Sequence, residues 1–324
     1  MRRNRQSAQV SLAFLIASTI TLGMLALTIV LVGQSFRGME SAKITAASAT
    51  ARQLAVSVDD RIRAITGPPS TALAVLSHDP LAVADTLQQR LVRMPVVANI
   101  LDSSDIVSAV YAGYDNGDFF LLRKIRSSGA MQFPDAPTNA QYLLQSITRA
   151  EDGRPQPMWH FYDASRTLLE RRTPSDYRFD PRDRGWYELA DASGTTELTA
   201  PYVFFTTGET GLTLSRRQAT AKGMDNNTVF GIDVTVTDLG TQLAELRQTP
   251  GTRIAIVNAE GSPLAYTGPD TTNSGTTSNT TKPQGLNDGA INAVLERDGM
   301  QATSELVNRF TTENRDWYGM TEPL

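Results

Sequence analysis

The stretch Val10–Gly33, VSLAFLIASTITLGMLALTIVLVG, decides how this chain is organised. It contains no charged side chain, and none occurs between Arg5 and Arg37. A helix needs about 20 predominantly apolar residues to cross the hydrocarbon core of a bilayer, so this stretch is long enough to span one. Its Ser and Thr hydroxyls can bond to carbonyls of the helix itself, which makes them tolerable in lipid. The sequence therefore predicts a transmembrane helix at 10–33, with the lipid bilayer as a partner.

A cleaved signal peptide is the alternative interpretation of this stretch. Such a peptide has an apolar core of about 7 to 15 residues, followed closely by a small-residue cleavage site. Here the apolar core is longer, and the small residues of Ala46–Ala51 lie well beyond it, which favours an uncleaved anchor. Arg2, Arg3 and Arg5 precede the span, so the positive-inside rule places residues 1–9 in the cytoplasm. Everything after Gly33 is then expected outside the cytoplasm.

Composition excludes several classes of function. The chain has 324 residues with 30 basic and 34 acidic side chains, so it lacks the strongly basic surface of a nucleic-acid-binding protein. It has no cysteine and only two histidines, His78 and His160, without ligand-spaced partners, so neither a metal site nor a cofactor is predicted. No nucleophile elbow, P-loop, dinucleotide fingerprint or zinc-protease motif occurs either. We therefore predict no enzymatic activity for this chain.

Two helices are expected directly after the span. Residues 41–65 are rich in alanine, with larger apolar residues at helical spacing, and predict a long helix that continues outward from the membrane. Gly67, Pro68 and Pro69 are expected to end or kink it, because proline lacks a backbone donor and clashes with the preceding turn. A second helix is predicted at Leu81–Val92, after the start signal Asp79-Pro80.

The period then changes to that of strands. Ile106–Tyr114 and Phe119–Arg126 are β-branched and aromatic, and they flank an Asn-Gly pair that favours a tight hairpin turn. Further strands are predicted at residues 157–162, 198–206, 212–218 and 229–235. A short amphipathic helix follows the N-cap hydroxyls of Thr235 and Thr237. Strands at 253–257 and 263–266 then repeat the strand–turn–strand pattern, which indicates an α+β fold with two antiparallel-sheet lobes in tandem.

The second lobe is expected to be the smaller one. Residues 267–284, TGPDTTNSGTTSNTTKPQ, contain no apolar run, and such a composition predicts a mobile loop. Only 40 residues follow this loop before the chain ends at Leu324, so the second unit is expected to be truncated. The predicted division is a long helix with the first lobe at 34–247 and the second lobe at 248–324.

The stretch most informative about function is Tyr177–Tyr202, YRFDPRDRGWYELADASGTTELTAPY. Its Asp-Pro-Arg turn, followed by a glycine that permits an unusual backbone angle, can present Arg184, Trp186 and Tyr187 into one concavity. An arginine fork beside two aromatic rings suits a carboxylate or another planar anion. Two alternatives stay open: the aromatic residues can be ordinary core residues, and Arg184 can pair at the surface with Asp180 or Asp183.

These residues resemble a known family. Phe179–Tyr187 (FDPRDRGWY), Pro201–Phe205 (PYVFF) and Gly231–Asp233 (GID) together are similar to the double-Cache sensor domains of bacterial membrane receptors. Val110–Arg123 and Tyr202–Gly211 look most like the Cache regions that precede class III adenylate or guanylate cyclases. The resemblance covers residues 41–266. It implies two PAS-like lobes on a long helix, with the ligand in the membrane-distal lobe.

The resemblance also implies roles for particular residues. In the members that bind amino acids, an R-x-W-Y motif holds the ligand carboxylate, and a later Tyr and Asp hold its amino group. The matching positions here are Arg184, Trp186 and Tyr187 for the carboxylate, and Tyr202 and Asp233 for the amine. Asp233 has an alternative role, because a carboxylate just before Thr235 can support the N-terminus of the next helix.

Two positions depart from the family pattern. Phe179 lies where such sensors commonly have Tyr, and Phe204 lies where they commonly have an acidic residue. Loss of that acid removes a charge-assisted bond of about 1.5 to 3 kcal/mol to a bound ammonium. The remaining residues favour a carboxylate or a neutral molecule, so the expected ligand is a small carboxylate or an amino-acid-like compound.

The function expected from this combination is a sensor module in the bacterial inner membrane. It would bind a small ligand outside the cytoplasm and transmit a signal across the membrane, with an output domain absent from this chain. The resemblance further implies a homodimer formed through the membrane-adjacent helix. A stand-alone periplasmic binding or interaction protein anchored to the membrane is the alternative, and an anchored enzyme is a third hypothesis.

Overall fold

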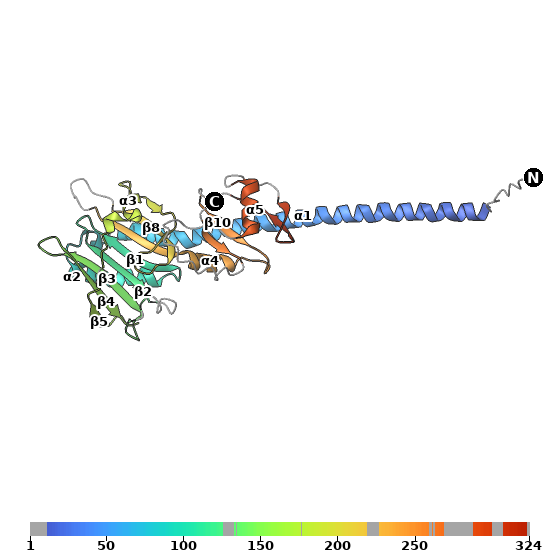
Figure 1. Ribbon diagram of the computed structural model, residues 1–324. Coiled ribbons are helices and arrows are strands. Elements are labelled where there is room, and N and C mark those ends of the chain that lie inside the picture. The colour runs from blue at the N-terminus through green and yellow to red at the C-terminus, as the bar shows by residue number, and fades with distance from the viewer. Residues whose placement is uncertain are drawn as a thin grey trace, which may run out of the picture.

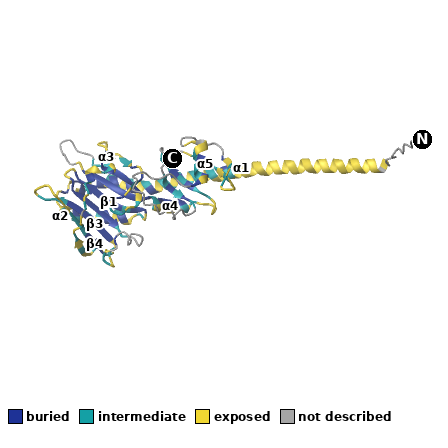
Figure 2. Ribbon diagram, in the orientation of Figure 1, coloured by how far each residue is buried: buried dark blue, intermediate teal, exposed yellow. Residues whose placement is uncertain are grey.

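A single long helix, α1 (Leu12–Leu76), forms the axis of the molecule. The computed structural model describes residues 12–125, 133, 135–175, 177–218, 227–258, 261, 263–268, 288–299 and 307–322. Figure 1 shows the first half of α1 as a rod that projects from the folded part, while its second half runs along both sheet units. The projecting half is exposed throughout (Figure 2), and α1 is the one helix among the described residues that is long and apolar enough to cross a membrane.

The expectation that Gly67, Pro68 and Pro69 end the first helix is wrong. α1 continues through both prolines to Leu76, and Leu73 and Leu76 in this last part are fully buried. A proline inside a helix costs about 3 kcal/mol, whereas burial of one leucine side chain contributes about 1.5 to 3 kcal/mol. Burial of this apolar segment against the sheet therefore offsets the unfavourable backbone.

The second helix, α2, begins later than predicted. Asp79-Pro80 starts a single 3₁₀ turn, η1 (Pro80–Val83), and α2 runs over Leu87–Asp102. Its N-terminus is a capping box in which Thr86 accepts a bond from the Gln89 amide while the Gln89 side chain accepts from the Thr86 amide. This reciprocal pair satisfies two otherwise unpaired donors, which makes it a stronger start signal than the proline.

A nine-stranded antiparallel sheet forms the main unit, with the order β5-β4-β3-β2-β1-β9-β8-β6 and β7 beside β8. Its strands are β1 (Val107–Gly113), β2 (Phe119–Lys124), β3 (Tyr142–Arg149), β4 (Pro155–Tyr162), β5 (Leu168–Arg172), β6 (Thr196–Leu198), β7 (Tyr202–Val203), β8 (Thr210–Arg217) and β9 (Val229–Thr235). The predicted α+β fold is confirmed, and so is the β1–β2 hairpin, whose Gly117 has a φ of 82°. β3 and β5 were not predicted, and the strand expected at 198–206 is two short strands.

The two faces of this sheet have different roles. One face packs on α1 and α2, where Val110, Leu122 and Leu144 join Leu73 and Leu76 in one core cluster. The side chains that alternate with these point to the opposite face, where Tyr111, Phe119 and Leu121 pack with aromatic residues of the segment 177–206. This second face carries the cavity described below.

A second, smaller unit follows the sheet. Thr235 caps α4 (Val236–Ala244) as predicted, and β10 (Ile254–Val257) pairs with β11 (Pro263–Thr267). α5 (Gly289–Asp298) and the hairpin of β12 (Asn308–Thr312) and β13 (Arg315–Gly319) complete its described part. Most of the loop predicted at 267–284 lies outside the described residues. In Figure 1 this unit lies along α1 between the large sheet and the projecting rod, and the ion pair of Arg309 with Glu40 (2.6 Å) ties it to the helix.

Candidate ligand pocket

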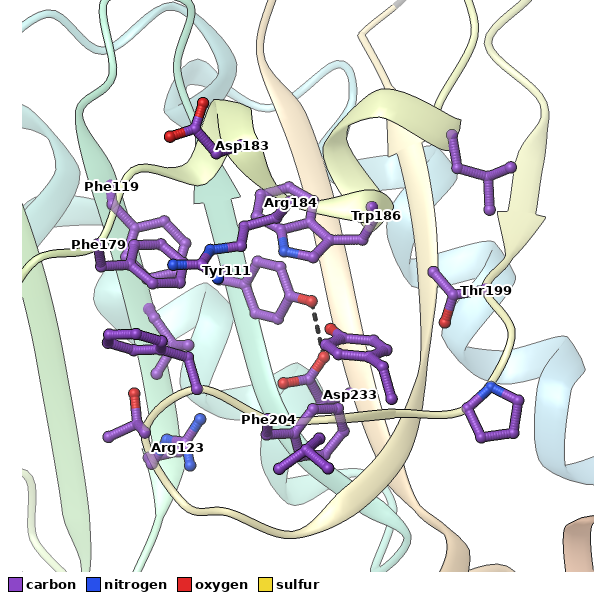
Figure 3. Close-up of a pocket in the computed structure, with 18 of the residues that line it drawn as sticks. Tyr111, Phe119, Arg123, Phe179, Asp183, Arg184, Trp186, Thr199, Phe204 and Asp233 are labelled. Atoms are coloured by element: carbon purple, nitrogen blue, oxygen red, sulfur yellow. Dashed lines mark hydrogen bonds between the residues drawn. The ribbon is translucent and has the colours of Figure 1, made fainter. Parts of the chain in front are cut away.

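A cavity of about 450 Å³ lies on the face of the large sheet that is turned away from α1. Strands β1, β2 and β9 form its floor, and the segment from Tyr177 to Thr206 forms its walls and rim. Four of the five residues predicted to bind ligand line it: Arg184, Trp186, Tyr202 and Asp233. Figure 3 shows Arg184, Trp186 and Asp233 converging from separate elements on one space.

The Asp-Pro-Arg turn that precedes Arg184 is stabilised by ion pairs of Asp180 with other arginines. Asp180 caps the 3₁₀ turn η3 (Pro181–Asp183) by accepting a bond from the Arg182 amide, and its carboxylate pairs with Arg149 (3.0 Å) and Arg182 (2.7 Å). Hydrogen bonding by Arg182 lowers the pKa of Asp180 to about 2. Asp180 thus pairs with two other arginines, and among the described residues Arg184 forms no ion pair with Asp180 or Asp183.

Arg184 contacts two neighbouring aromatic rings at the pocket wall. Its guanidinium carbon is 4.6 Å from the ring centre of Phe179 and 4.7 Å from that of Phe205. The Nε atom is buried and has no hydrogen-bond partner. The cation–π contacts hold the guanidinium in place while its donors stay available, which suits a planar anion such as a carboxylate. Phe179, noted above as a departure from the family pattern, therefore has a place in this site as one of the two rings that contact Arg184.

Trp186 and Tyr187 follow Arg184 in the short helix α3 (Gly185–Leu189), where Gly185 does not have a positive φ. Trp186 is 3% exposed and lines the cavity, with its ring 4.8 Å from that of Tyr111. It is therefore a core residue and a pocket residue at once.

Tyr187 does not line the cavity. Its hydroxyl donates to the carbonyl of Asn227 (3.0 Å), and the Arg217 guanidinium lies over its ring. The expectation that Tyr187 joins Arg184 and Trp186 in the concavity is wrong for this residue, because the helical turn of α3 directs successive side chains to different sides.

The floor of the pocket carries a buried carboxylate, Asp233 on β9. Tyr111 donates to its Oδ1 from 2.6 Å, and Thr213 donates to the same atom from 2.6 Å. Thr213 has one hydroxyl proton and gives it to Asp233, so Tyr202, 2.6 Å away, is the donor in its contact with Thr213. Both hydroxyl bonds to the carboxylate end on Oδ1, which leaves Oδ2 for a ligand.

Burial controls the charge of this carboxylate. Asp233 is 4% exposed, and desolvation raises its pKa to about 6, although the bonds from Thr213 and Tyr111 act in the opposite direction. Two residues later, Thr235 supplies the N-cap of α4, so the alternative role of Asp233 as support for that helix is already filled by another side chain. Asp233 is ionised at neutral pH and is turned toward the cavity.

The sequence interpretation missed Arg123 on β2, which also lines the cavity. It is 6% exposed, and its Nε has no hydrogen-bond partner. Burial lowers its pKa, and the charge of Asp233 counteracts that effect. The sequence did hold a signal: Arg123 shares a strand face with Phe119 and Leu121, so the alternation of β2 places a charge on a buried face.

The described residues offer no metal site. No group of three or more His, Asp or Glu side chains there lies close enough together to hold an ion. The polar groups that line the cavity include two guanidinium groups, one buried carboxylate, and the hydroxyls of Tyr111 and Tyr202 beside that carboxylate.

Comparison with known proteins agrees with this architecture. The chain is 28% identical over 254 residues to Adenylate cyclase 1 of Rhizobium meliloti (strain 1021), a match that covers 77% of this chain and 38% of that protein. No family model matches the chain.

Among solved structures, the ligand-binding domain of the Campylobacter jejuni chemoreceptor Tlp3 is similar. Its complex with 4-methylisoleucine matches with a TM-score of 0.50 and 14% identity over 84% of each chain. Its complex with L-norvaline matches with a TM-score of 0.50 and 14% identity, over 85% of this chain and 84% of that one. At this identity the likeness concerns the fold, and it confirms that this chain has the fold of the sensory domains of bacterial chemoreceptors.

Proposed function

We propose that this chain is a membrane-anchored sensory module whose distal cavity binds a small ligand of the α-amino-acid type. The observation that carries the proposal is the pair of opposite charges in one cavity. Arg184 presents unpaired guanidinium donors at the wall, and Asp233 presents a buried carboxylate at the floor. A molecule that carries both a carboxylate and an ammonium group complements both at once.

Because the Nε atom of Arg184 and the carboxylate of Asp233 are buried, their position in the cavity supports a role in binding. A buried charge without a hydrogen-bonded partner is unfavourable by several kcal/mol, so a stable fold rarely keeps one without a use. The aromatic residues around the cavity lower the local dielectric constant, which strengthens any charge pair formed there. The crystal structures of Tlp3 with 4-methylisoleucine and with L-norvaline show that this fold accommodates amino acids in another receptor.

Phe204 does not remove the amine end of the proposed site. It lies where family members commonly have an acid, and here its buried ring packs closely against Gly211 and Tyr202. Asp233 and the hydroxyls of Tyr111 and Tyr202 are at this end of the cavity, so in our proposal Asp233 Oδ2 accepts from the ligand ammonium.

The proposal extends to the whole chain. The exposed apolar half of α1 would anchor the protein in the inner membrane with residues 1–9 in the cytoplasm, and residues 34–247 and 248–324 would form the distal and proximal lobes outside. Ligand binding would change the geometry of α1 and of a second copy paired with it, and so signal across the membrane. The similarity to an adenylate cyclase over part of that protein's length supports a cyclase-type output in the full-length relatives.

A thermal-shift screen of the whole chain in detergent micelles tests the proposal. A ligand that binds only the folded state raises the free energy of unfolding by mass action, by about 2.7 kcal/mol at a concentration 100 times its Kd. The melting midpoint rises with it. We expect stabilisation by one or more L-α-amino acids and loss of that stabilisation in Arg184→Ala. Arg182→Ala is the matched control, because Arg182 lies two residues away, pairs with Asp180 and does not line the cavity. Stabilisation that survives Arg184→Ala, or a full panel without any shift, would contradict the proposal.

A further inference from the structure

Arg123 is the charge in the cavity that a simple amino acid would leave unmatched. The lining contains Arg123, Arg184, Asp183 and Asp233 as its charged residues. Asp183 is exposed at the rim, and in Figure 3 its carboxylate points away from the other labelled side chains. The charges that face the interior are therefore two guanidinium groups against one carboxylate. A neutral zwitterionic amino acid would satisfy Arg184 and Asp233 and leave Arg123 without an anion.

Among the described residues, no side chain forms a hydrogen bond or an ion pair with Arg123. Its Nε has no hydrogen-bond partner, and it takes part in no ion pair among the described residues. Asp233 attracts it only through space, and so does Glu209, which is half-buried and lies outside the lining. Tyr111 and Thr213 both bond to Oδ1 of Asp233, and no hydrogen bond or ion pair joins this carboxylate to Arg123 in the described part of the chain.

The position of Arg123 separates it from the site for the ligand's α-carboxylate. Arg184 enters from the turn before α3, whereas Arg123 comes from β2 in the sheet floor, and Figure 3 shows the two guanidinium groups reaching the pocket from these separate elements. A cavity of about 450 Å³ has room for an amino acid whose side chain extends away from Arg184 toward the floor.

We infer that Arg123 binds the side-chain carboxylate of the ligand, so that the cavity selects acidic α-amino acids of the aspartate and glutamate class. This inference rests on the proposed function and adds the ligand class to it. In such a complex Arg184 pairs with the α-carboxylate, Asp233 with the ammonium and Arg123 with the second carboxylate. Each interior charge then has a partner, and the ligand's net charge of −1 cancels the excess positive charge of the site.

Titration of the full-length chain with isosteric ligand pairs tests this inference. L-Glutamate and L-glutamine have side chains of the same shape that end in a carboxylate and in a neutral amide, and L-aspartate and L-asparagine differ in the same way. We expect the wild type to bind the acidic member of at least one pair about tenfold or more tightly, the size of one charge-assisted hydrogen bond. Arg123→Met keeps the apolar stem and removes the charge, so it should weaken binding of the acidic member by about the same factor. The amide member should bind Arg123→Met at least as well as it binds the wild type.

Two further variants separate the role of the Arg123 charge from that of Arg184. Arg123→Lys retains a charge and should recover part of the preference for the acidic ligand. Arg184→Ala should abolish binding of both members of a pair. Unliganded Arg123→Met should melt at or above the wild-type temperature, because it loses an unpaired buried charge, and this melt reports that the variant is folded.

The possible failures are distinct. Equal affinity of the wild type for glutamate and glutamine, or a glutamate affinity unchanged in Arg123→Met, overturns the role of Arg123. If other amino acids then bind in an Arg184-dependent manner, the proposed function still stands. If no amino acid binds the wild type, both the inference and the proposed function fail.

Discussion

Among single residues, Asp233 has the charge that most directly determines how ligand binding depends on pH. Its pKa of about 6 places its titration close to physiological pH, and the cause is burial in the sheet floor. Burial also lowers the pKa of His160 to about 4. This residue lies on β4 and does not line the cavity. Changes in ligand binding between pH 5 and pH 7 should therefore report on Asp233.

We predict that affinity for an α-amino acid falls as pH is lowered through 6. An ionised Asp233 accepts from the ligand ammonium, whereas a protonated one does not, so affinity should fall about tenfold per pH unit well below the pKa. Calorimetric titrations at pH 5, 6, 7 and 8 measure this directly. In Asp233→Asn the affinity should be low and independent of pH over this range. Affinity that stays constant in the wild type would show that Asp233 does not contact the ligand cation.

The raised pKa of Asp233 also predicts that, without ligand, this group contributes more to stability as pH falls, opposite to the trend expected for ligand affinity. The folded-state pKa of Asp233 is raised above its ordinary value of 3.8, so the native state binds the proton more tightly than the unfolded state. The contribution of this group to the free energy of unfolding is largest below pH 4 and is lost as pH rises through 6, by on the order of 3 kcal/mol. Chemical denaturation at several pH values checks it, because Asp233→Asn should remove this component of the pH dependence.

At the scale of elements, the packing of β1 against β9 sets the shape of the pocket floor. Gly231 on β9 pairs with Tyr111 on β1, and a Cβ atom added at Gly231 would lie 2.1 Å from the Tyr111 ring. The absent side chain is what allows the Tyr111 ring to lie over β9 with its hydroxyl on Asp233. Strand pairing and a glycine thus place a hydrogen-bond donor that the sequence alone did not single out.

We predict that Gly231→Ala damages both the fold and the site. The tyrosine ring must move, which should destabilise the protein by about 1 to 3 kcal/mol and weaken ligand binding through loss of the bond to Asp233. Gly67→Ala in α1 is the matched control, because nothing lies within 4 Å of the added atom and alanine favours a helix by up to about 1 kcal/mol. Unfolding curves and titrations of the two variants measure the difference. Equal behaviour of both variants would contradict this account of the floor.

Much of the fold could be predicted from local sequence patterns, but not all of it. The β1–β2 hairpin and the N-cap of α4 are determined by neighbouring residues, and both were predicted within a residue or two. The length of α1 was not, because its continuation past Pro69 depends on burial of Leu73 and Leu76 by strands that lie far along the chain. Tertiary packing outweighs the local signal there.

The site shows the same limit. Arg184 and Trp186 were predicted from the turn that presents them, Tyr202 and Asp233 from the family resemblance, and the structure places all four around one cavity. Tyr187 was expected beside them, but the turn of α3 directs it elsewhere. Arg123 was missed because its significance depends on the absence of a partner, and only the assembled sheet shows which side chains surround it.

At the scale of the whole molecule, α1 joins the large sheet to the predicted membrane span. Large apolar side chains stay exposed along its projecting half, including Phe36 and Met39, which lie just beyond the predicted span. Exposed apolar residues on a long helix favour pairing with a second copy. This agrees with the proposed dimer and gives it a test.

The absence of cysteine makes that test simple. We predict that single cysteines introduced at Phe36 or Met39 cross-link two copies of the chain in membranes under mild oxidation. A cysteine at Val92, which is 65% exposed on α2 in the distal unit, serves as the control and should not cross-link. Non-reducing electrophoresis distinguishes the outcomes. Cross-linking at Val92 but at neither α1 position would contradict a dimer formed through the helix.

The most direct test of the central claim is a calorimetric titration of L-α-amino acids into the full-length chain and its Arg184→Ala and Asp233→Asn variants. If the cavity binds through both charges, a ligand should bind the wild type at one site per chain, and each variant should lose about tenfold or more in affinity. A ligand that binds the wild type and both variants equally well would contradict the account, because its site would then lie elsewhere in the molecule.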